Sequence, residues 1–264
     1  MIYLKTEDEI EKLRQANLLV SRTLVEIAKI IQPGVTTRQL DTLAEQFIRD
    51  NGAIPTFKGF PNPYGPEFPA SICTSVNEVV VHGIPNDLPL KDGDVVSVDC
   101  GTLLDGFCGD SCYTFRVGQV SDEIQNLLAT TKASLYKAIE QCHVGKRIGD
   151  ISYAVQSLCE EQGYGVVKEF VGHGIGRSMH EDPQVPNYGK RGCGKQIKNG
   201  LCIAIEPMIT MGNPEIAMLP DRWGVVTRDG KVAAHFEHTI AVHHGKAEIL
   251  SSFAEIEEIE RQRY

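Results

Sequence analysis

Residues 99–110 read DCGTLLDGFCGD and place one aspartate at each end of a predicted β-hairpin. Asp105 and Gly106 are the kind of pair that fills the two central positions of a tight hairpin turn. Because side chains alternate between the faces of a strand, this turn puts Asp99 and Asp110 on one face as diagonal neighbours. Two like charges on a shared face repel unless a cation lies between them. The hairpin therefore predicts a cation site, with two solvated carboxylates on an edge hairpin as the alternative.

Histidines and glutamates elsewhere supply further candidate ligands. The segment GHGIGRSMHE places His173 and His180 in a predicted glycine-rich loop, where the backbone approaches a ligand closely. The segment LCIAIEPMI ends an apolar strand with Glu206. The segment AHFEHTIAV places Glu237 in mid-strand between apolar neighbours, where an unpaired carboxylate is costly. A satisfied core histidine and a solvated strand end are the structural alternatives for these residues.

Two aspartates, two glutamates and one histidine form a ligand set that is rich in oxygen and poor in nitrogen. This composition suits a catalytic pair of Mn, Fe, Co or Zn ions better than a closed structural zinc site, which prefers thiolates and imidazoles. A pair of divalent ions lowers the pKa of a water molecule and stabilises the oxyanion that the water produces. The residues therefore predict a metal-dependent hydrolase.

Composition and charge narrow the class of protein. The 264 residues are 42% hydrophobic and 23% charged, as in globular proteins. A net charge of -9 disfavours nucleic acid or an anionic membrane as the main partner. The N-terminus lacks a secretion signal and no apolar run is long enough to span a membrane, so we expect a cytoplasmic protein. The eight cysteines include no C-x-x-C pair and are expected to be mostly free thiols.

The order of the predicted elements favours the α+β class. Periodicity and capping boxes predict four helices: from Thr6 to Pro33-Gly34, from Thr36 to Asn51-Gly52, over about 122–142 and over about 149–162. Strand patterns lie between the second and third helices and after residue 165, and residues 55–69 form a loop that presents aromatic rings. We expect a largely antiparallel sheet with helices on one face, in a single domain over residues 1–264.

Five segments occur in the order that is typical of one enzyme family: CTSVNEVVVHGIP, DGDVVSVDCGTLLDGFCGD, EFVGHGIGRSMHEDPQVPNY, IAIEPM and FEHTIAV. Over nearly its whole length the chain resembles the methionine aminopeptidases of type I, within the pita-bread metallopeptidases. The resemblance implies a pita-bread fold, with a curved and largely antiparallel sheet, helices on its outer face and pseudo-two-fold halves. It also implies removal of the initiator methionine from nascent proteins by hydrolysis of the first peptide bond, with a preference for a small second residue.

The resemblance assigns a metal centre and catalytic residues. The ligands of two divalent ions, drawn from Co, Mn, Fe, Zn and Ni, would be Asp99, Asp110, His173, Glu206 and Glu237. Of these, Asp110 and Glu237 would bridge the two ions. Glu206 would also move a proton during catalysis. His180 would support the carbonyl oxygen of the substrate, and His82 would contact the nitrogen of the scissile bond.

The resemblance also assigns a pocket for the methionine side chain, lined by Phe68, Cys73, His82, Phe170, Met179, His180 and Trp223. Aromatic rings and a thiol suit an unbranched thioether. Met179 stands where the family usually has an aromatic residue. The loop at NPYGPEF is longer than usual, so either Phe60 or Tyr64 supplies the second ring of the pocket. Asn77 stands where the family holds a monovalent cation.

The expected substrate is the N-terminal methionine of nascent chains. We expect the protein to be a monomer that contacts the ribosome transiently. A prolidase or Xaa-Pro aminopeptidase is the nearest alternative, but such enzymes usually carry a further N-terminal domain, and only two predicted helices precede CTSVNE here. A type II methionine aminopeptidase is disfavoured because only 25 residues separate His180 from Glu206. A catalytically inactive binding module is the third alternative, although all five ligands are present.

Overall fold

The computed structural model describes all 264 residues and contains five helices. They are α1 (Glu7–Ile30), α2 (Thr37–Asp50), α3 (Asp122–Glu140), α4 (Ile148–Glu161) and α5 (Ala254–Arg263). The side chains of Thr6 and Thr36 cap α1 and α2 as the sequence predicts, although α1 ends three residues before Pro33. The limits of α3 and α4 agree with the prediction to within two residues, whereas α5 was not predicted. None of the helices combines the length and the apolar character that a membrane span requires.

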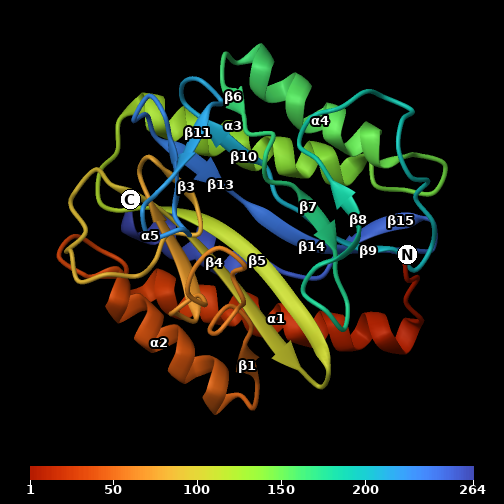
Figure 1. The fold of residues 1–264 in the computed structure, drawn as a ribbon, viewed down its shortest axis with the longest axis horizontal. Coiled ribbons are helices and arrows are strands. Elements are labelled where there is room, and N and C mark those ends of the chain that lie inside the picture. The colour runs from red at the N-terminus through yellow and green to blue at the C-terminus, as the bar shows by residue number, and fades with distance from the viewer.

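Fifteen short strands complete the fold: β1 (Ile54–Pro55), β2 (Ile72–Val76), β3 (Val79–Val81), β4 (Val95–Leu104), β5 (Phe107–Arg116), β6 (Gly165–Val166), β7 (Gly172–Gly174), β8 (Glu181–Val185), β9 (Cys202–Ile205), β10 (Met208–Thr210), β11 (Ile216–Met218), β12 (Val225–Thr227), β13 (Ala233–His235), β14 (Glu237–His243) and β15 (Lys246–Ile249). Nine of them form one sheet in the order β1-β4-β5-β14-β9-β7-β8, with β2 paired to β4 and β15 paired to β14 (Figure 1). Two small sheets have the orders β13-β10-β6 and β11-β12-β3. The pairings are antiparallel, which confirms the expected α+β class.

The hairpin of β4 and β5 has the register that its turn predicts. Asp99 lies opposite Cys112, and Asp110 lies opposite Gly101. The two turn residues have positive φ angles of 49° and 78°, as a tight hairpin turn of this kind requires. On the other side of β5, Glu237 at the start of β14 also pairs with Cys112. Because directly paired residues share a face of the sheet, the three carboxylates point to the same side.

The opposite face of the large sheet packs against the helices. Val96, Val98 and Cys100 alternate with Asp99 along β4, and their side chains join the main apolar core together with residues from all five helices. Figure 1 shows α1 and α2 along one half of the molecule and α3 and α4 along the other. The expected placement of the helices on one face of the sheet is confirmed, and the acidic side chains lie on the other face.

Two halves of the chain repeat one local arrangement. The helices α1 and α2 pack together in the first half, and α3 and α4 pack together in the second. Gly34 and Gly145, with φ angles of 91° and 99°, each lie two residues before the N-cap of the second helix of the pair. Those N-cap residues, Thr36 and Arg147, each form an isolated antiparallel β-bridge with a residue later in the chain. The repeat agrees with the pseudo-two-fold halves that the resemblance implies.

Two candidate ligands lie in local structure that differs from the prediction. Glu237 is not in mid-strand: β13 belongs to a small sheet, the chain crosses at Phe236, and Glu237 begins β14 in the large sheet. The apolar pattern of the sequence continues from β13 through Phe236 into β14, so the sequence alone predicts one continuous strand. His173 is not in a loop but at the centre of β7. Its glycine neighbours serve close strand packing, because a Cβ at Gly172 or Gly174 would lie 2.4 or 2.2 Å from a backbone oxygen.

Arg263 closes the C-terminal end of α1 from the end of α5. Its guanidinium donates to the backbone oxygens of Ile31, Ala28 and Lys29 at 2.7, 2.9 and 3.1 Å. A cation there also suits the negative end of the helix dipole. We expect Arg263→Ala to lower the free energy of unfolding, measured with urea, by about 1.5 kcal/mol. Arg261→Ala, on the exposed side of α5, is the control and should change it by less than about 0.5 kcal/mol; equal effects would contradict the capping role.

Candidate functional site

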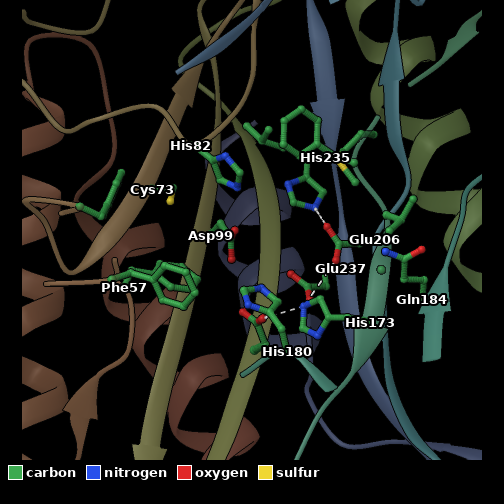
Figure 2. A pocket seen from close by; sticks show the side chains of 18 of the residues that line it. Phe57, Cys73, His82, Asp99, His173, His180, Gln184, Glu206, His235 and Glu237 are labelled. Atoms are coloured by element: carbon green, nitrogen blue, oxygen red, sulfur yellow. Dashed lines mark ion pairs between the residues drawn. The ribbon is translucent and has the colours of Figure 1, made fainter. Parts of the chain in front are cut away.

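A cavity of about 530 Å³ lies on the face of the large sheet that carries the acidic side chains (Figure 2). It brings together twelve of the residues that the sequence analysis singled out: Phe60, Phe68, Cys73, His82, Asp99, Asp110, Phe170, His173, His180, Glu206, Trp223 and Glu237. Several side chains that the sequence analysis did not assign to the site also line it, among them Phe57, Gln184 and His235. Gln184 lies in EFVGHGIGRSMHEDPQVPNY, His235 in AHFEHTIAV and Phe57 in the aromatic loop of residues 55–69, but no periodicity places them at the site, because their positions depend on how distant segments pack.

Neighbouring strands deliver the candidate metal ligands. Asp99 comes from β4, Asp110 from β5 and Glu237 from the first position of β14, while Glu206 follows β9 and His173 is central in β7. Nε2 of His173 lies 3.6 Å from Oδ2 of Asp110 and 3.6 Å from Oε1 of Glu206. Ligand atoms of Asp110, His173 and Glu237 all lie within 4.8 Å of one another. Asp99 lines the same cavity, so the five side chains converge on one small volume.

Three buried oxygens of this group have no hydrogen-bond partner: Oδ1 of Asp99, Oδ1 of Asp110 and Oε1 of Glu237. A buried carboxylate oxygen without a partner is costly, because nothing offsets the loss of its hydration. Divalent cations would satisfy these oxygens. Four carboxylates and one imidazole are ligands that Mn, Fe, Co and Zn accept. The residues therefore fit a metal centre.

Burial raises the pKa of all four carboxyl groups. The pKa of Asp110 rises to about 8. The pKa values of Asp99, Glu206 and Glu237 rise well above their usual range, because burial and the neighbouring Asp110 carboxylate both disfavour their charged forms. So many like charges in one buried volume do not ionise together without cations. Bound metal is thus the condition under which this group is fully ionised near neutral pH.

Burial has the opposite effect on the imidazoles around the cavity. It lowers the pKa of His82 and of His180 to about 4 and that of His235 to about 3. The three rings are therefore neutral at pH 7, and each offers one N–H donor and one acceptor nitrogen. The ring of His180 packs edge to face on that of His173, with 4.4 Å between the centroids. A neutral donor thus lies directly beside the ligand group.

Aromatic rings form an apolar wall of the same cavity. Phe68 and Trp223 pack edge to face with 5.1 Å between ring centroids, and His82 packs in the same way on Phe170 at 5.3 Å. Cys73 joins Phe68 in a small buried cluster. Burial and nearby carboxylates raise the pKa of the Cys73 thiol well above its usual value, so this group is uncharged. The wall therefore suits an apolar side chain without charge.

The structure places Phe60 at this wall and Met179 away from it. Met179 is not among the residues that line the cavity, because its side chain is buried in a separate apolar cluster. It lies against Gly101, where an added Cβ would be 2.5 Å from its Cε. Phe60 lines the cavity and packs edge to face on His180 at 5.4 Å, whereas Tyr64 is 78% exposed. Of the two rings considered, Phe60 is the one at the cavity.

Asn77 links three segments at a turn where its φ is 52°. Its side-chain oxygen accepts a hydrogen bond from the N–H of Val95 at 3.0 Å, and its side-chain amide donates to Asp94 at 2.9 Å. Its backbone oxygen accepts from the N–H of Ala233 at 2.9 Å. The structure thus explains Asn77 as a link between strands, and a monovalent cation there stays a prediction.

Comparison with known proteins identifies the family of the chain. A model of metallopeptidase family M24 matches residues 11–244, a range that includes all five candidate ligands. The chain belongs to metallopeptidase family M24. This M24 metallopeptidase is 48% identical to the methionine aminopeptidase of Clostridium acetobutylicum over 252 residues, which cover 95% of this chain and 99% of that relative.

Solved structures agree with this assignment. The crystal structure of the methionine aminopeptidase from Thermotoga maritima matches this M24 metallopeptidase with a TM-score of 0.92 and 41% identity, over 96% of this chain and all of that one. The expected pita-bread fold is confirmed. The prolidase from Pyrococcus furiosus shares the fold alone, with a TM-score of 0.76 and 20% identity, over 94% of this chain and 65% of the prolidase.

Proposed function

We propose that this M24 metallopeptidase is a methionine aminopeptidase, which removes the initiator methionine from nascent proteins and prefers a small second residue. The observation that carries the proposal is a single cavity in which a convergent group of metal ligands borders an uncharged wall of aromatic rings and a thiol. Such a wall suits the unbranched thioether of methionine. The alignment with a relative named methionine aminopeptidase over 99% of its length adds support.

The metal would be held by Asp99, Asp110, His173, Glu206 and Glu237, with Asp110 and Glu237 shared between two ions. Divalent ions bound there would lower the pKa of water and stabilise negative charge on oxygen. The orphaned oxygens of the two aspartates and of Glu237 support this ligand set. The number of ions and their identity among Co, Mn, Fe, Zn and Ni stay predictions.

Three side chains would act on the substrate at the edge of the ligand group. Glu206 would move the proton, because its carboxyl group borders both the ligands and the cavity. His180 would donate an N–H to the substrate carbonyl oxygen as that oxygen gains negative charge. His82 would contact the nitrogen of the scissile bond. Because both imidazoles are neutral, they supply hydrogen bonds without repelling the cationic amine of the substrate.

Peptide assays with added metals test the proposed function. The protein is incubated with Met-Gly-Met-Met and with a Leu-Pro peptide while Mn, Fe or Co is added in turn. We expect release of methionine from the first peptide and no cleavage of the second. Cleavage of the Leu-Pro peptide would instead support an Xaa-Pro aminopeptidase or a prolidase. No release with any metal would support the inactive binding module.

Trp223 is expected to determine how tightly the methionine side chain is bound. Its Nε1 donates to the backbone oxygen of Pro66 at 2.9 Å, and its ring packs on Phe68. We expect Trp223→Ala to raise KM for Met-Gly-Met-Met about 10–50-fold with little change in kcat, because the lost contact binds substrate and transition state alike. The exposed Tyr64 supplies the control, since Tyr64→Ala should change KM less than about twofold. An unchanged KM in Trp223→Ala would place the methionine side chain elsewhere.

We further propose that the enzyme acts as a monomeric single domain over residues 1–264 in the cytoplasm, on the N-terminal methionine of nascent chains. One apolar core runs through both halves of the chain, which supports a single domain. The net charge of -9 argues against nucleic acid or an anionic membrane as a main partner. A transient contact with the ribosome stays a prediction.

A further inference from the structure

His235 is a buried imidazole beside the ligand group and lines the same cavity. It ends β13, only 2% of it is exposed, and its Nε2 has no hydrogen-bond partner. This nitrogen lies 3.7 Å from Oε2 of Glu206. Figure 2 shows the ring directed at that carboxyl group. Because buried polar atoms without partners are rare in proteins, this nitrogen calls for an explanation.

The side chain of His235 is not needed to hold its own strand. Oγ1 of Thr114 accepts from the backbone N–H of His235 at 3.0 Å and donates to its backbone oxygen at 2.6 Å. His238 shows the contrasting case of a structural histidine. Its Nδ1 lies 2.6 Å from Oγ of Ser251, and its Nε2 lies 3.3 Å from the hydroxyl of Tyr136. The backbone of His235 is thus anchored while its ring remains available.

Glu206 has a fixed main chain and a carboxyl group that lies between two imidazoles. Nδ2 of Asn187 donates to the backbone oxygen of Glu206 at 2.9 Å. Oε1 of Glu206 lies 3.6 Å from Nε2 of His173, and Oε2 lies 3.7 Å from Nε2 of His235. A hydrogen bond to His235 therefore needs a shift of less than about 1 Å. Hydrogen bonds in active sites are often long before the other components bind and then shorten.

We propose that His235 is a positioning residue, which donates Nε2–H to Oε2 of Glu206 and so keeps Oε1 directed at the other metal ligands. A hydrogen bond to an ionised carboxylate is about twice as strong as one between neutral groups. Partners of this kind orient metal ligands and tune them. The expected effect of His235 on the turnover of a methionine peptide rests on the proposed function, whereas its expected effect on metal affinity does not.

A direct role as a metal ligand fits the geometry less well. The ligand atoms that lie within 4.8 Å of one another belong to Asp110, His173 and Glu237. The imidazole of that group is His173. The one carboxyl group with an oxygen within 4.0 Å of an imidazole nitrogen of His235 is that of Glu206. His235 is in contact with Glu206 instead, on the side opposite His173. This arrangement favours an indirect effect through Glu206.

Three substitutions of His235 test the positioning role. Glutamine places an amide N–H close to the position of Nε2–H, asparagine carries the same amide one carbon short, and leucine has no donor. With Met-Gly-Met-Met we expect kcat to fall about 10–100-fold in His235→Leu and His235→Asn, with KM within about threefold. In His235→Gln both should stay within about threefold of the wild type. Mn²⁺ affinity, measured by calorimetric titration, should follow the same order. It should be about tenfold lower than wild type in His235→Leu and His235→Asn, and close to wild type in His235→Gln.

Several results would overturn the proposal. Wild-type kcat and Mn²⁺ affinity in His235→Leu and His235→Asn would show that the ring does not act on Glu206. A His235→Gln variant as impaired as His235→Leu would indicate a lost metal ligand. If His235→Leu does not fold, the comparison of His235→Asn with His235→Gln still tests whether a donor at the position of Nε2–H is required. If the wild type releases no methionine, the proposed function fails, but the calorimetric order still tests the role of His235.

His238→Gln is the matched control for the loss of a buried imidazole. The ring of His238 stacks on Phe253 in the main core, with 3.8 Å between centroids, and does not line the cavity. We expect this variant to lower Tm while kcat and Mn²⁺ affinity stay within about twofold. Equal losses of kcat and Mn²⁺ affinity in His238→Gln and His235→Leu would show that any buried imidazole here has that effect, and would overturn a specific role for His235.

Discussion

Asp110→Asn is expected to reduce kcat for methionine release by about 10³-fold or more while the protein still folds. Asp110 lies on the buried face of the β4–β5 hairpin, where Oδ1 has no partner, and this free oxygen supports the proposal that its carboxylate bridges two ions. An amide offers one neutral acceptor oxygen in place of two charged ones and so cannot bridge them as well. The measurement is turnover of metal-stripped and reconstituted protein. Wild-type activity in this variant would refute the assignment of Asp110 as a ligand.

Asp105→Asn is the control for this experiment. It makes the same chemical change at the exposed turn of the same hairpin, where φ is 49°. Asparagine tolerates positive φ well, so the register of the hairpin should persist. We expect kcat within about twofold of the wild type. A large loss in Asp105→Asn would mean that any neutralisation on this hairpin is damaging, and the result for Asp110 would then say little about metal binding.

The same Asp110→Asn change should stabilise the metal-free protein above neutral pH. Burial raises the pKa of Asp110 to about 8, whereas an unfolded aspartate titrates near its ordinary value. Between these values the folded state keeps a proton that the unfolded state releases, so the free energy of unfolding falls as pH rises. Asparagine does not titrate. Metal-free Asp110→Asn should therefore melt about 5 °C above the metal-free wild type at pH 8, with a smaller difference at pH 5. A lower Tm at pH 8 would contradict the shifted pKa.

Glu206→Gln is expected to lower kcat by about 10³-fold and to change KM by less than about fivefold. A glutamine side chain retains the shape of Glu206 but does not carry a proton between water and the leaving amine. Its effect should therefore appear in the chemical step more than in substrate binding. Steady-state kinetics on Met-Gly-Met-Met with saturating Mn²⁺ measure both constants. Small and equal changes in kcat and KM would argue against proton transfer by Glu206. The exposed Glu215 provides the control, since Glu215→Gln should leave both constants within about twofold.

The parts of the fold that depend on local chemistry were predictable from the sequence. The capping boxes at Thr6 and Thr36 start helices where they were expected, because their hydrogen bonds involve residues only three positions apart. The register of the β4–β5 hairpin follows from its two turn residues in the same way. That register places Asp99 and Asp110 on one face, so half of the acidic cluster was visible before any tertiary contact was known.

Features that depend on distant segments were not predictable in this way. The apolar segment is divided at Phe236 because β13 pairs in a small sheet and β14 pairs in the large one. The hydrophobic periodicity of the sequence does not show this division. Met179 was assigned to the pocket by resemblance, but packing against Gly101 keeps its side chain in another cluster. His235 looks like any histidine in an apolar strand, and its relation to Glu206 appears only when β13 and the end of β9 are placed together. The three cases share one cause, namely contacts between residues far apart in the chain.

A metal titration of protein that a chelator has stripped of metal tests the proposed metal-dependent removal of methionine most directly. Bound metal and the rate of methionine release from Met-Gly-Met-Met are measured on the same samples as Mn, Fe or Co is returned. We expect no release from stripped protein, a rate that rises with bound metal up to two ions per chain, and no cleavage of a Leu-Pro peptide at any metal loading. Release at the full rate from stripped protein, or a rate that does not follow bound metal, would contradict this proposal.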